Sequence, residues 1–316
     1  MTGMNVGSTG RSGRAALLVA AAVLVAGCLP RTPTRTSRPR VERAPWTERT
    51  ARAESGHTYR YLHIDGPRED APVMLLLPGG IFDARIWLYT DELAERFEVI
   101  ALDWPDNSLF YSGDVANWGD VVADFLGALQ VERLHVAAVS MGTYGAIELA
   151  ARDGGPEVLS LTLISSVMFA LTPEEVEERT GFAQRALSYA PERMRAIVEW
   201  SAGRVDYAPP PGAVRQLDIF WVRPYPYYYQ VFRMAVRQAD RPQDTDAIEC
   251  PVLFLHGTED ETYPVDVARG NPSVFPAAAT TRWIEIAGAG HEMVFSHGPR
   301  VVGEIFAFLE TVPADE

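Results

Sequence analysis

The 316-residue sequence contains no lysine and only two cysteines, and beyond its N-terminal region it has no apolar run of membrane-spanning length. Without a span of about 20 apolar residues, the main part of the chain is not a multi-pass membrane protein. With so few cysteines, the fold must rest on its core and not on a disulfide framework. The sequence also has no H-E-x-x-H, paired C-x-x-C or P-loop motif, so it predicts neither a metal site nor a cofactor.

Acidic residues outnumber basic ones by 42 to 28, which gives a formal net charge of −14. The imbalance is larger after residue 55, because nine of the arginines lie before that point with only three glutamates. The remaining 19 basic and 39 acidic residues leave this part of the chain with a charge of about −20. Such a charge disfavours nucleic acid as a partner.

The N-terminus combines positive charge, an apolar stretch and a cysteine. Arg11 and Arg14 precede the apolar run Ala15–Ala26, and the cysteine follows in Val25–Cys28. This segment resembles the signal peptide and lipobox of bacterial lipoproteins. The resemblance implies cleavage after residue 27, lipidation of the Cys28 thiol and anchoring to a membrane of the cell envelope. The alternatives are an ordinary secretory signal and an uncleaved anchor.

Leu29, the residue after the cysteine, is compatible with sorting to the periplasmic face of an outer membrane. Residues 28–55 are rich in proline and arginine and show no sustained apolar period. We therefore expect a solvated tether with a root-mean-square reach of about 30 Å. Once Cys28 carries lipid, only Cys250 remains, and we interpret it as a small core residue at the start of a strand.

From residue 56 onward, apolar runs of strand length alternate with helical segments such as Val115–Leu129 and Pro299–Thr311. An edge strand is expected around Tyr59–Ile64. Alternation of this kind predicts an α/β fold with a doubly wound, mostly parallel sheet, whose ligands bind at the carboxyl ends of the strands. The six expected buried strands are Val73–Leu77, Phe97–Leu102, Leu134–Val139, Leu159–Ser165, Pro251–His256 and Thr281–Ile286.

The alternation stops between residues 167 and 246, which we expect to form an inserted helical cap. The segment contains helix-start signals, including the capping box Thr172–Glu175. It also contains seven aromatic residues within thirteen positions. Some of these must pack the cap onto the sheet, and others are expected to line an apolar substrate pocket. The predicted pocket residues are Phe220, Trp221, Tyr225 and Tyr228.

The most informative motif is Ala138–Gly142, with the sequence Ala-Val-Ser-Met-Gly. It follows an expected buried strand and precedes an expected helix, Thr143–Arg152. A serine on such a sharp turn has a strained backbone and an exposed hydroxyl, which suits a nucleophile. Ala138 replaces the first glycine of the G-x-S-x-G pattern, and it is the least disruptive replacement for a residue that neighbouring backbone approaches closely.

Two further residues follow their own strands: Asp260 in Gly-Thr-Glu-Asp, and His291 in Gly-Ala-Gly-His. The chain order Ser140, Asp260, His291 resembles that of the α/β-hydrolase family, over about residues 56–316. The resemblance implies an α/β-hydrolase core formed by residues 56–166 and 247–316. It also implies that His291 accepts the proton of Ser140 while Asp260 orients the imidazole. Glu259 and Glu261 compete with Asp260 for this role.

The family resemblance also implies an oxyanion hole made of two backbone amides. One belongs to Met141 and the other to Gly80, with Ile81 as the alternative to Gly80. Pro78 stands where many relatives have histidine, so the hydrogen bonds that support this loop are expected to differ. We interpret His256 and His297 as structural residues.

Together these features predict a serine hydrolase that acts through an acyl-enzyme, with a small apolar or aromatic carboxylic ester as substrate. An aminopeptidase, which would act on amides, and a C–C bond hydrolase of the same fold are alternatives. A third alternative is a binding lipoprotein that keeps the fold without catalysis. No part of the sequence indicates the oligomeric state.

Overall fold

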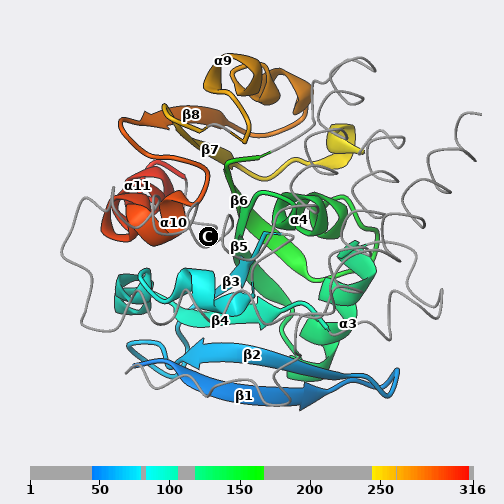
Figure 1. Ribbon diagram of the computed structural model, residues 1–316. Coiled ribbons are helices and arrows are strands. Elements are labelled where there is room, and N and C mark those ends of the chain that lie inside the picture. The colour runs from blue at the N-terminus through cyan, green and yellow to red at the C-terminus, as the bar shows by residue number, and fades with distance from the viewer. Residues whose placement is uncertain (1–44, 80–82, 106–117, 167–243, 261, 313–316) are drawn as a thin grey trace, which may run out of the picture. The chain divides into compact units, whose positions relative to one another are not determined.

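The computed structural model describes residues 45–79, 83–105, 118–166, 244–260 and 262–312. Eight strands form one sheet in the order β1-β2-β4-β3-β5-β6-β7-β8 (Figure 1). Strand β2 pairs antiparallel with both β1 and β4, and all the other pairs are parallel. The predicted α/β fold with a mostly parallel sheet is confirmed. The strands are β1 (Thr47–Arg52), β2 (Thr58–Ile64), β3 (Val73–Leu77), β4 (Glu98–Asp103), β5 (Arg133–Val139), β6 (Glu157–Ile164), β7 (Val252–Gly257) and β8 (Thr281–Ile286).

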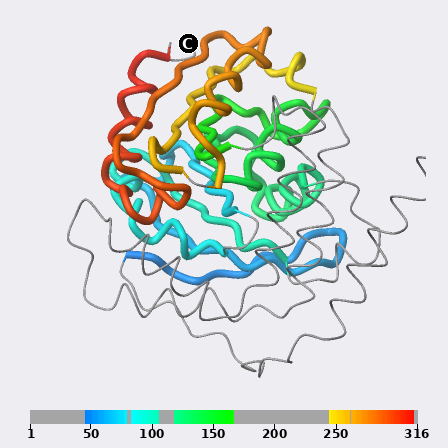
Figure 2. Tube along the Cα trace, turned by 45° about the horizontal axis from the view of Figure 1, so that its top comes forward, coloured from blue at the N-terminus to red at the C-terminus, as the bar shows by residue number. Residues whose placement is uncertain are grey.

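Helices cover both faces of this sheet (Figure 1). One face packs against α3 (Trp118–Leu129) and α4 (Gly142–Ala150), and the other against α10 (Met293–Ser296) and α11 (Gly298–Leu309). Figure 2 shows the N-terminal strands, in blue, at the opposite edge of the sheet from the orange strand β8. The remaining short elements are α9 (Val265–Ala268) and the 3-10 turns η1 (Ala84–Trp87), η2 (Asp91–Glu95), η3 (Thr245–Ala247) and η4 (Asn271–Val274).

Strand β3 explains why the two faces have separate cores. Met74 and Leu76 point into the cluster that includes α11, whereas Leu75 and Leu77 point into the cluster that includes α3 and α4. Successive side chains of a strand point to opposite faces, so a continuous apolar run supplies both layers. Each fully buried leucine contributes ~1.5–3 kcal/mol relative to an exposed one.

The tether predicted for residues 28–55 is too long at its C-terminal end. Trp46 is buried, and Thr47–Arg52 form strand β1 along β2. Every β1 residue except Ala51 is exposed, so the sequence shows no alternation that would mark a strand. Backbone pairing with a neighbouring segment decides this element. The rest of the expected tether, together with Cys28 and the expected signal peptide, lies outside the described residues.

Other sequence-based boundaries agree with the structure to within a few residues, for example β8, which spans Thr281–Ile286 as expected. Cys250, just before β7, is a free thiol packed against the core, and burial raises its pKa to about 12. Residues 167–243 of the expected cap lie outside the described part. Among the described helices, none has the length and apolarity to cross a membrane.

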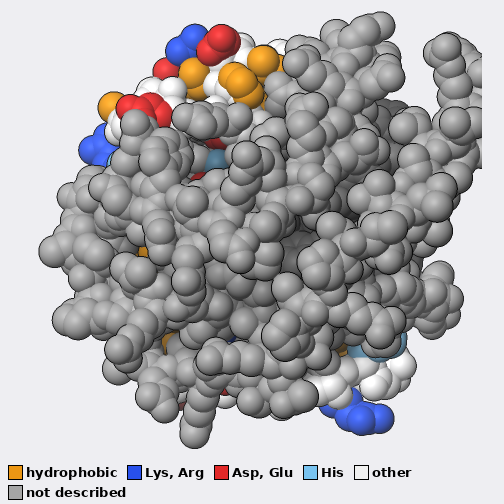
Figure 3. Space-filling model, in the orientation of Figure 1, with side chains coloured by type: hydrophobic (Ala, Val, Ile, Leu, Met, Phe, Trp, Pro, Cys, Tyr) orange, Lys and Arg blue, Asp and Glu red, His pale blue; other side chains and the backbone are white. Residues whose placement is uncertain are grey.

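The surface around α9 and β8 carries side chains of different chemical types. Acidic, basic and apolar side chains lie side by side there (Figure 3). Arg269 and Glu285 form a bidentate pair in this region, with distances of 2.7 and 3.0 Å. Solvent screens an exposed pair of this kind, so it contributes little to stability.

Candidate active site

Ser140 lies in the turn after the carboxyl end of β5 and before α4. Figure 1 shows these two elements next to each other in the middle of the fold. Its φ angle of 53° places it in the left-handed region, which is unfavourable for a residue with a side chain. Its backbone N–H donates to the carbonyl oxygen of Ile164 over 2.9 Å, so the neighbouring strand β6 holds the turn. The Thr143 hydroxyl donates to the carbonyl oxygen of Ser140 over 2.6 Å from the first turn of α4.

Gly142 is required by the close approach of the chain after β3. A Cβ atom at this position would lie 2.5 Å from the Pro78 carbonyl oxygen and 2.8 Å from that of Leu77. Real contacts do not reach these distances, and backbone atoms cannot rotate away as side chains do. Ala138, at the other end of the motif, is fully buried, and its methyl group fits within the core on the α3 side of the sheet.

The side chains of Ser140, His291 and Asp260 form a continuous chain of contacts. His291 Nε2 lies 2.9 Å from Ser140 Oγ, and His291 Nδ1 lies 2.8 Å from Asp260 Oδ2. His291 and Asp260 are buried, whereas Ser140 is partly exposed. The three residues predicted as the catalytic set are therefore brought together from turns that are far apart in the sequence.

The turn after β7 and the turn after β8 are held against each other. The N–H of Glu259 donates to the Ala289 carbonyl oxygen over 2.9 Å. A side chain at Gly257 would overlap the same carbonyl group, so glycine permits this approach. The close contact between the two turns sets the separation of Asp260 and His291.

Asp260 is surrounded by donors. Its Oδ1 accepts hydrogen bonds from the backbone N–H groups of Thr262 and Tyr263, at 2.9 and 2.7 Å. Its Oδ2 faces His291 at 2.8 Å, and His256 Nε2 lies 3.4 Å from the same oxygen. Burial alone would raise the pKa of Asp260, but the charge and hydrogen bond of His291 outweigh burial and lower it. The carboxyl group is therefore ionised at neutral pH.

The pKa of the His291 imidazole shifts in the opposite direction to that of Asp260. Burial lowers the pKa of His291, but the charge and hydrogen bond of Asp260 oppose it and raise the pKa to about 9. In its neutral form His291 donates from Nδ1 to Asp260 and presents the lone pair of Nε2 to Ser140. This arrangement can accept a proton from the serine hydroxyl.

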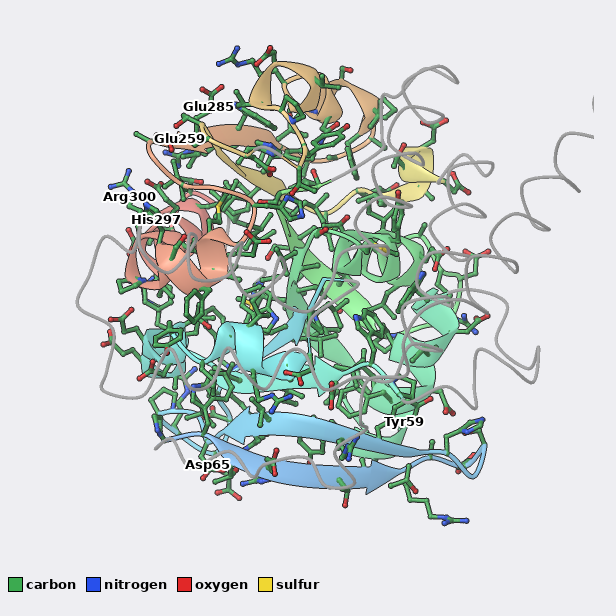
Figure 4. The ribbon with its side chains drawn as sticks, in the orientation of Figure 1. Tyr59, Asp65, Glu259, Glu285, His297 and Arg300 are labelled. Atoms are coloured by element: carbon green, nitrogen blue, oxygen red, sulfur yellow. The ribbon has the colours of Figure 1, made fainter. Side chains whose placement is uncertain are left out.

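Met141 directly follows Ser140 and caps α4, so the residue expected to supply one oxyanion donor lies in the described turn. Gly80 and Ile81, the candidates for the second donor, lie outside the described residues. The same holds for the four aromatic residues expected in the pocket and for Glu261. Glu259 is exposed, and Asp260 is the residue that bonds to His291. His297, at the start of α11, has its Nδ1 2.8 Å from the Ser296 hydroxyl (Figure 4).

Sequence reasoning did not assign a role to two residues that support the site. The Trp104 indole N–H donates to the carbonyl oxygen of Pro78 over 2.9 Å, which supports the loop after β3. The hydroxyl of Ser165 donates to the carbonyl oxygen of His291 over 2.9 Å. Trp104 follows β4 and Ser165 follows β6, just as Asp260 and His291 follow their own strands. This position after a strand is the sequence signal that could have identified both residues. Among the described residues, no group of three or more His, Cys, Asp or Glu side chains could hold a metal ion.

Comparison with known proteins identifies the class. Residues 74–304 match the model of the alpha/beta hydrolase family. The match covers more than half of the chain, and the chain belongs to this family.

Solved structures of the same architecture include a membrane phospholipase A, described as a bacterial virulence factor. It has a TM-score of 0.67 and 24% identity, and the alignment covers 96% of this chain and 93% of that one. An esterase from Rhodococcus sp. ECU1013 has a TM-score of 0.63 and 19% identity, over 84% of this chain and 99% of that one. A carboxylesterase from Bacillus subtilis has a TM-score of 0.58 and 18% identity, over 84% and 91%. At these identities the likeness shows the fold.

Proposed function

We propose that this alpha/beta hydrolase is a serine hydrolase that cleaves carboxylic esters through an acyl-enzyme. The observation that carries the proposal is the chain of contacts from Ser140 Oγ through His291 to Asp260, at 2.9 and 2.8 Å. A serine hydroxyl is a weak nucleophile at neutral pH, and a neutral imidazole within hydrogen-bond distance is the group that activates it.

In the first half-reaction, Ser140 Oγ attacks the ester carbonyl carbon while its proton moves to His291 Nε2. Asp260 stabilises the resulting imidazolium and keeps Nδ1–H directed at its own Oδ2. The tetrahedral intermediate then collapses: the C–O bond to the alcohol breaks, and His291 returns the proton to the leaving oxygen. The product alcohol departs, and the acyl group remains on Ser140.

In the second half-reaction, water replaces the alcohol. His291 takes a proton from the water as its oxygen attacks the acyl carbon, and the same proton returns to Ser140 Oγ when the carboxylic acid leaves. The negative oxygen of each intermediate needs backbone donors. We propose the amide of Met141 and the amide of Gly80, or of Ile81, for this role.

The substrate is proposed to be a small ester with an apolar or aromatic portion, bound beside Phe220, Trp221, Tyr225 and Tyr228. The esterase and the carboxylesterase among the structural neighbours support ester chemistry. A phospholipid ester is a second candidate substrate, because the structural alignment with a membrane phospholipase A covers 96% of this chain.

We further propose that the protein is anchored in the bacterial cell envelope through lipid on Cys28. Because β1 begins at Thr47, the segment between the anchor and the folded part is shorter than the sequence predicts, with a reach of about 20–25 Å for a coil. Metabolic labelling with a radioactive fatty acid, compared with Cys28→Ala, tests the anchor. An unlabelled wild-type protein would contradict lipidation.

The central experiment is labelling by a fluorophosphonate probe, with Ser140→Ala as the control. We expect the wild-type protein to be labelled and the variant to remain unlabelled. Absence of labelling in folded wild-type protein would favour a binding protein that has lost catalysis.

Turnover assays then define the chemistry. We expect hydrolysis of p-nitrophenyl esters and little or no hydrolysis of aminoacyl-arylamides. Turnover of the amides alone would instead indicate an aminopeptidase. If the probe labels Ser140 but neither substrate is turned over, C–C bond substrates and phospholipid vesicles are the next assays.

A further inference from the structure

His256 is a buried histidine beside the proposed catalytic set, but it is not part of that set. It is the second-last residue of β7, it has no exposed surface, and its ring stacks on Trp283 with an interplanar angle of 17°. Its Nε2 lies 2.8 Å from the carbonyl oxygen of Tyr263 and 3.4 Å from Asp260 Oδ2.

The Tyr263 contact determines where the imidazole proton lies. A carbonyl oxygen can only accept a hydrogen bond, so Nε2 of His256 must carry the hydrogen. Burial lowers the pKa of His256 and opposes the attraction of Asp260, which favours the neutral ring. Its Nδ1 is buried and has no hydrogen-bond partner within the described residues.

The Nε2–H group of His256 contacts both Tyr263 and Asp260, the proposed catalytic acid. Tyr263 accepts from His256 through its carbonyl oxygen and donates to Asp260 Oδ1 through its own N–H, over 2.7 Å. The same Nε2–H faces Asp260 Oδ2, the oxygen that accepts from His291. A neutral donor adds no second positive charge that would compete with His291 for the carboxylate.

We propose that His256 is a positioning residue for the reaction. Its Nε2–H holds the Asp260–Tyr263 turn against the end of β7, which keeps Asp260 Oδ2 directed at His291. The inference rests on the proposed serine hydrolase function, because it concerns the orientation of that function's acid.

The test uses two substitutions at this position in the full-length protein. Gln places an amide N–H close to the site of Nε2–H, whereas Leu fills the space without a donor. With p-nitrophenyl esters as substrate, we expect His256→Leu to lower kcat by about tenfold, as expected for loss of a hydrogen bond that supports a charged group. We expect KM to stay within about twofold, because substrate binding is not involved. His256→Gln should recover most of kcat.

His63 provides the matched control. His63 lies on strand β2 and is 2% exposed. Its Nε2 lies 2.7 Å from Oε1 of Glu98, the first residue of β4. His63→Leu is expected to lower the unfolding temperature without changing kcat per fluorophosphonate-titrated site. Normalising to titrated sites separates activity from the loss of folded protein.

Three results would overturn the proposal. The first is a kcat for His256→Leu equal to that of His63→Leu. The second is an equal loss of kcat in the Gln and Leu variants, which would show that ring shape matters and the donor does not. The third applies if the Leu variant does not fold: a tenfold loss of kcat in the Gln variant, which keeps an N–H donor, would then overturn the proposal. Failure of the wild-type protein to react with fluorophosphonate or esters would refute the proposed function itself, independently of these comparisons.

Discussion

The hydroxyl of Ser165 donates a hydrogen bond to the main-chain carbonyl oxygen of His291 over 2.9 Å, across 126 residues of sequence. Ser165 follows β6, and like Ser140 it has a left-handed backbone, with φ of 45°. Its N–H donates to the carbonyl oxygen of Leu255 in β7. Ser165 therefore connects the middle of the sheet to the loop that carries His291.

Two substitutions separate the hydrogen bond of Ser165 from its backbone strain. Ser165→Ala removes the hydroxyl and keeps the strain, so we expect it to lower the free energy of unfolding by ~1–2 kcal/mol. Ser165→Gly removes both, and relief of the strain should offset part of the loss, by ~1 kcal/mol. Urea unfolding measures both values. A glycine variant less stable than the alanine variant would show that the left-handed conformation costs little here.

Gly142→Ala tests the close approach of the chain after β3. The added methyl group would press on the backbone at Pro78. We expect the free energy of unfolding to fall by ~2 kcal/mol or more, and most of the proposed esterase activity to be lost. Gly127→Ala in α3 is the matched control, because a Cβ there has no atom within 4 Å. That variant should gain ~0.5–1 kcal/mol, since alanine favours a helix over glycine. Equal stability of the two variants in urea would contradict the predicted clash.

The pH dependence of the reaction follows from His291. Only the neutral imidazole accepts a proton, and Asp260 raises the pKa of His291 to about 9. We therefore expect kcat/KM to fall as the pH decreases below that value. Asp260→Asn removes the charge that stabilises the imidazolium, so the acid limb should move to lower pH while the rate falls by about a thousandfold or more.

Glu259→Gln is the control for the pH profile, because this exposed neighbour of Asp260 carries the same type of charge. Its pH profile should resemble that of the wild-type enzyme. An acid limb that moves with Glu259→Gln and not with Asp260→Asn would reverse the assignment of the acid.

Trp104→Phe tests the support of the loop that follows β3. Phenylalanine keeps an aromatic ring against Trp118, which lies 4.4 Å away between ring centroids, but it cannot donate to the carbonyl oxygen of Pro78. We expect a loss of ~1 kcal/mol from the hydrogen bond in addition to the loss from the smaller ring, and a lower kcat on esters.

Trp87→Phe is the matched control for Trp104, because the buried indole N–H of Trp87 has no partner within the described residues. The cost of the smaller ring appears there without the loss of a hydrogen bond. If the two variants lose the same stability and neither changes kcat, the Trp104 bond does not support the proposed oxyanion loop.

Much of the fold could be predicted from the sequence, because a strand that is buried on both faces must be apolar along its whole length. Val73–Leu77 is such a case, and its side chains supply both core clusters. Strand β1 could not be predicted in this way. Its side chains are mostly exposed, so its stability comes from backbone hydrogen bonds to β2, which leave no apolar pattern.

The sequence by itself determined the order of the elements and the position of Ser140, Asp260 and His291 in turns that follow strands. In a parallel sheet these turns meet at one edge, so three residues far apart in the chain could be expected near each other. Only the tertiary structure decided which atoms meet: Ser165 with the carbonyl oxygen of His291, Trp104 with that of Pro78, and His256 with the Asp260–Tyr263 turn. Apolar periodicity reports burial, which is a property of each element, whereas a hydrogen bond between distant turns depends on how whole elements pack.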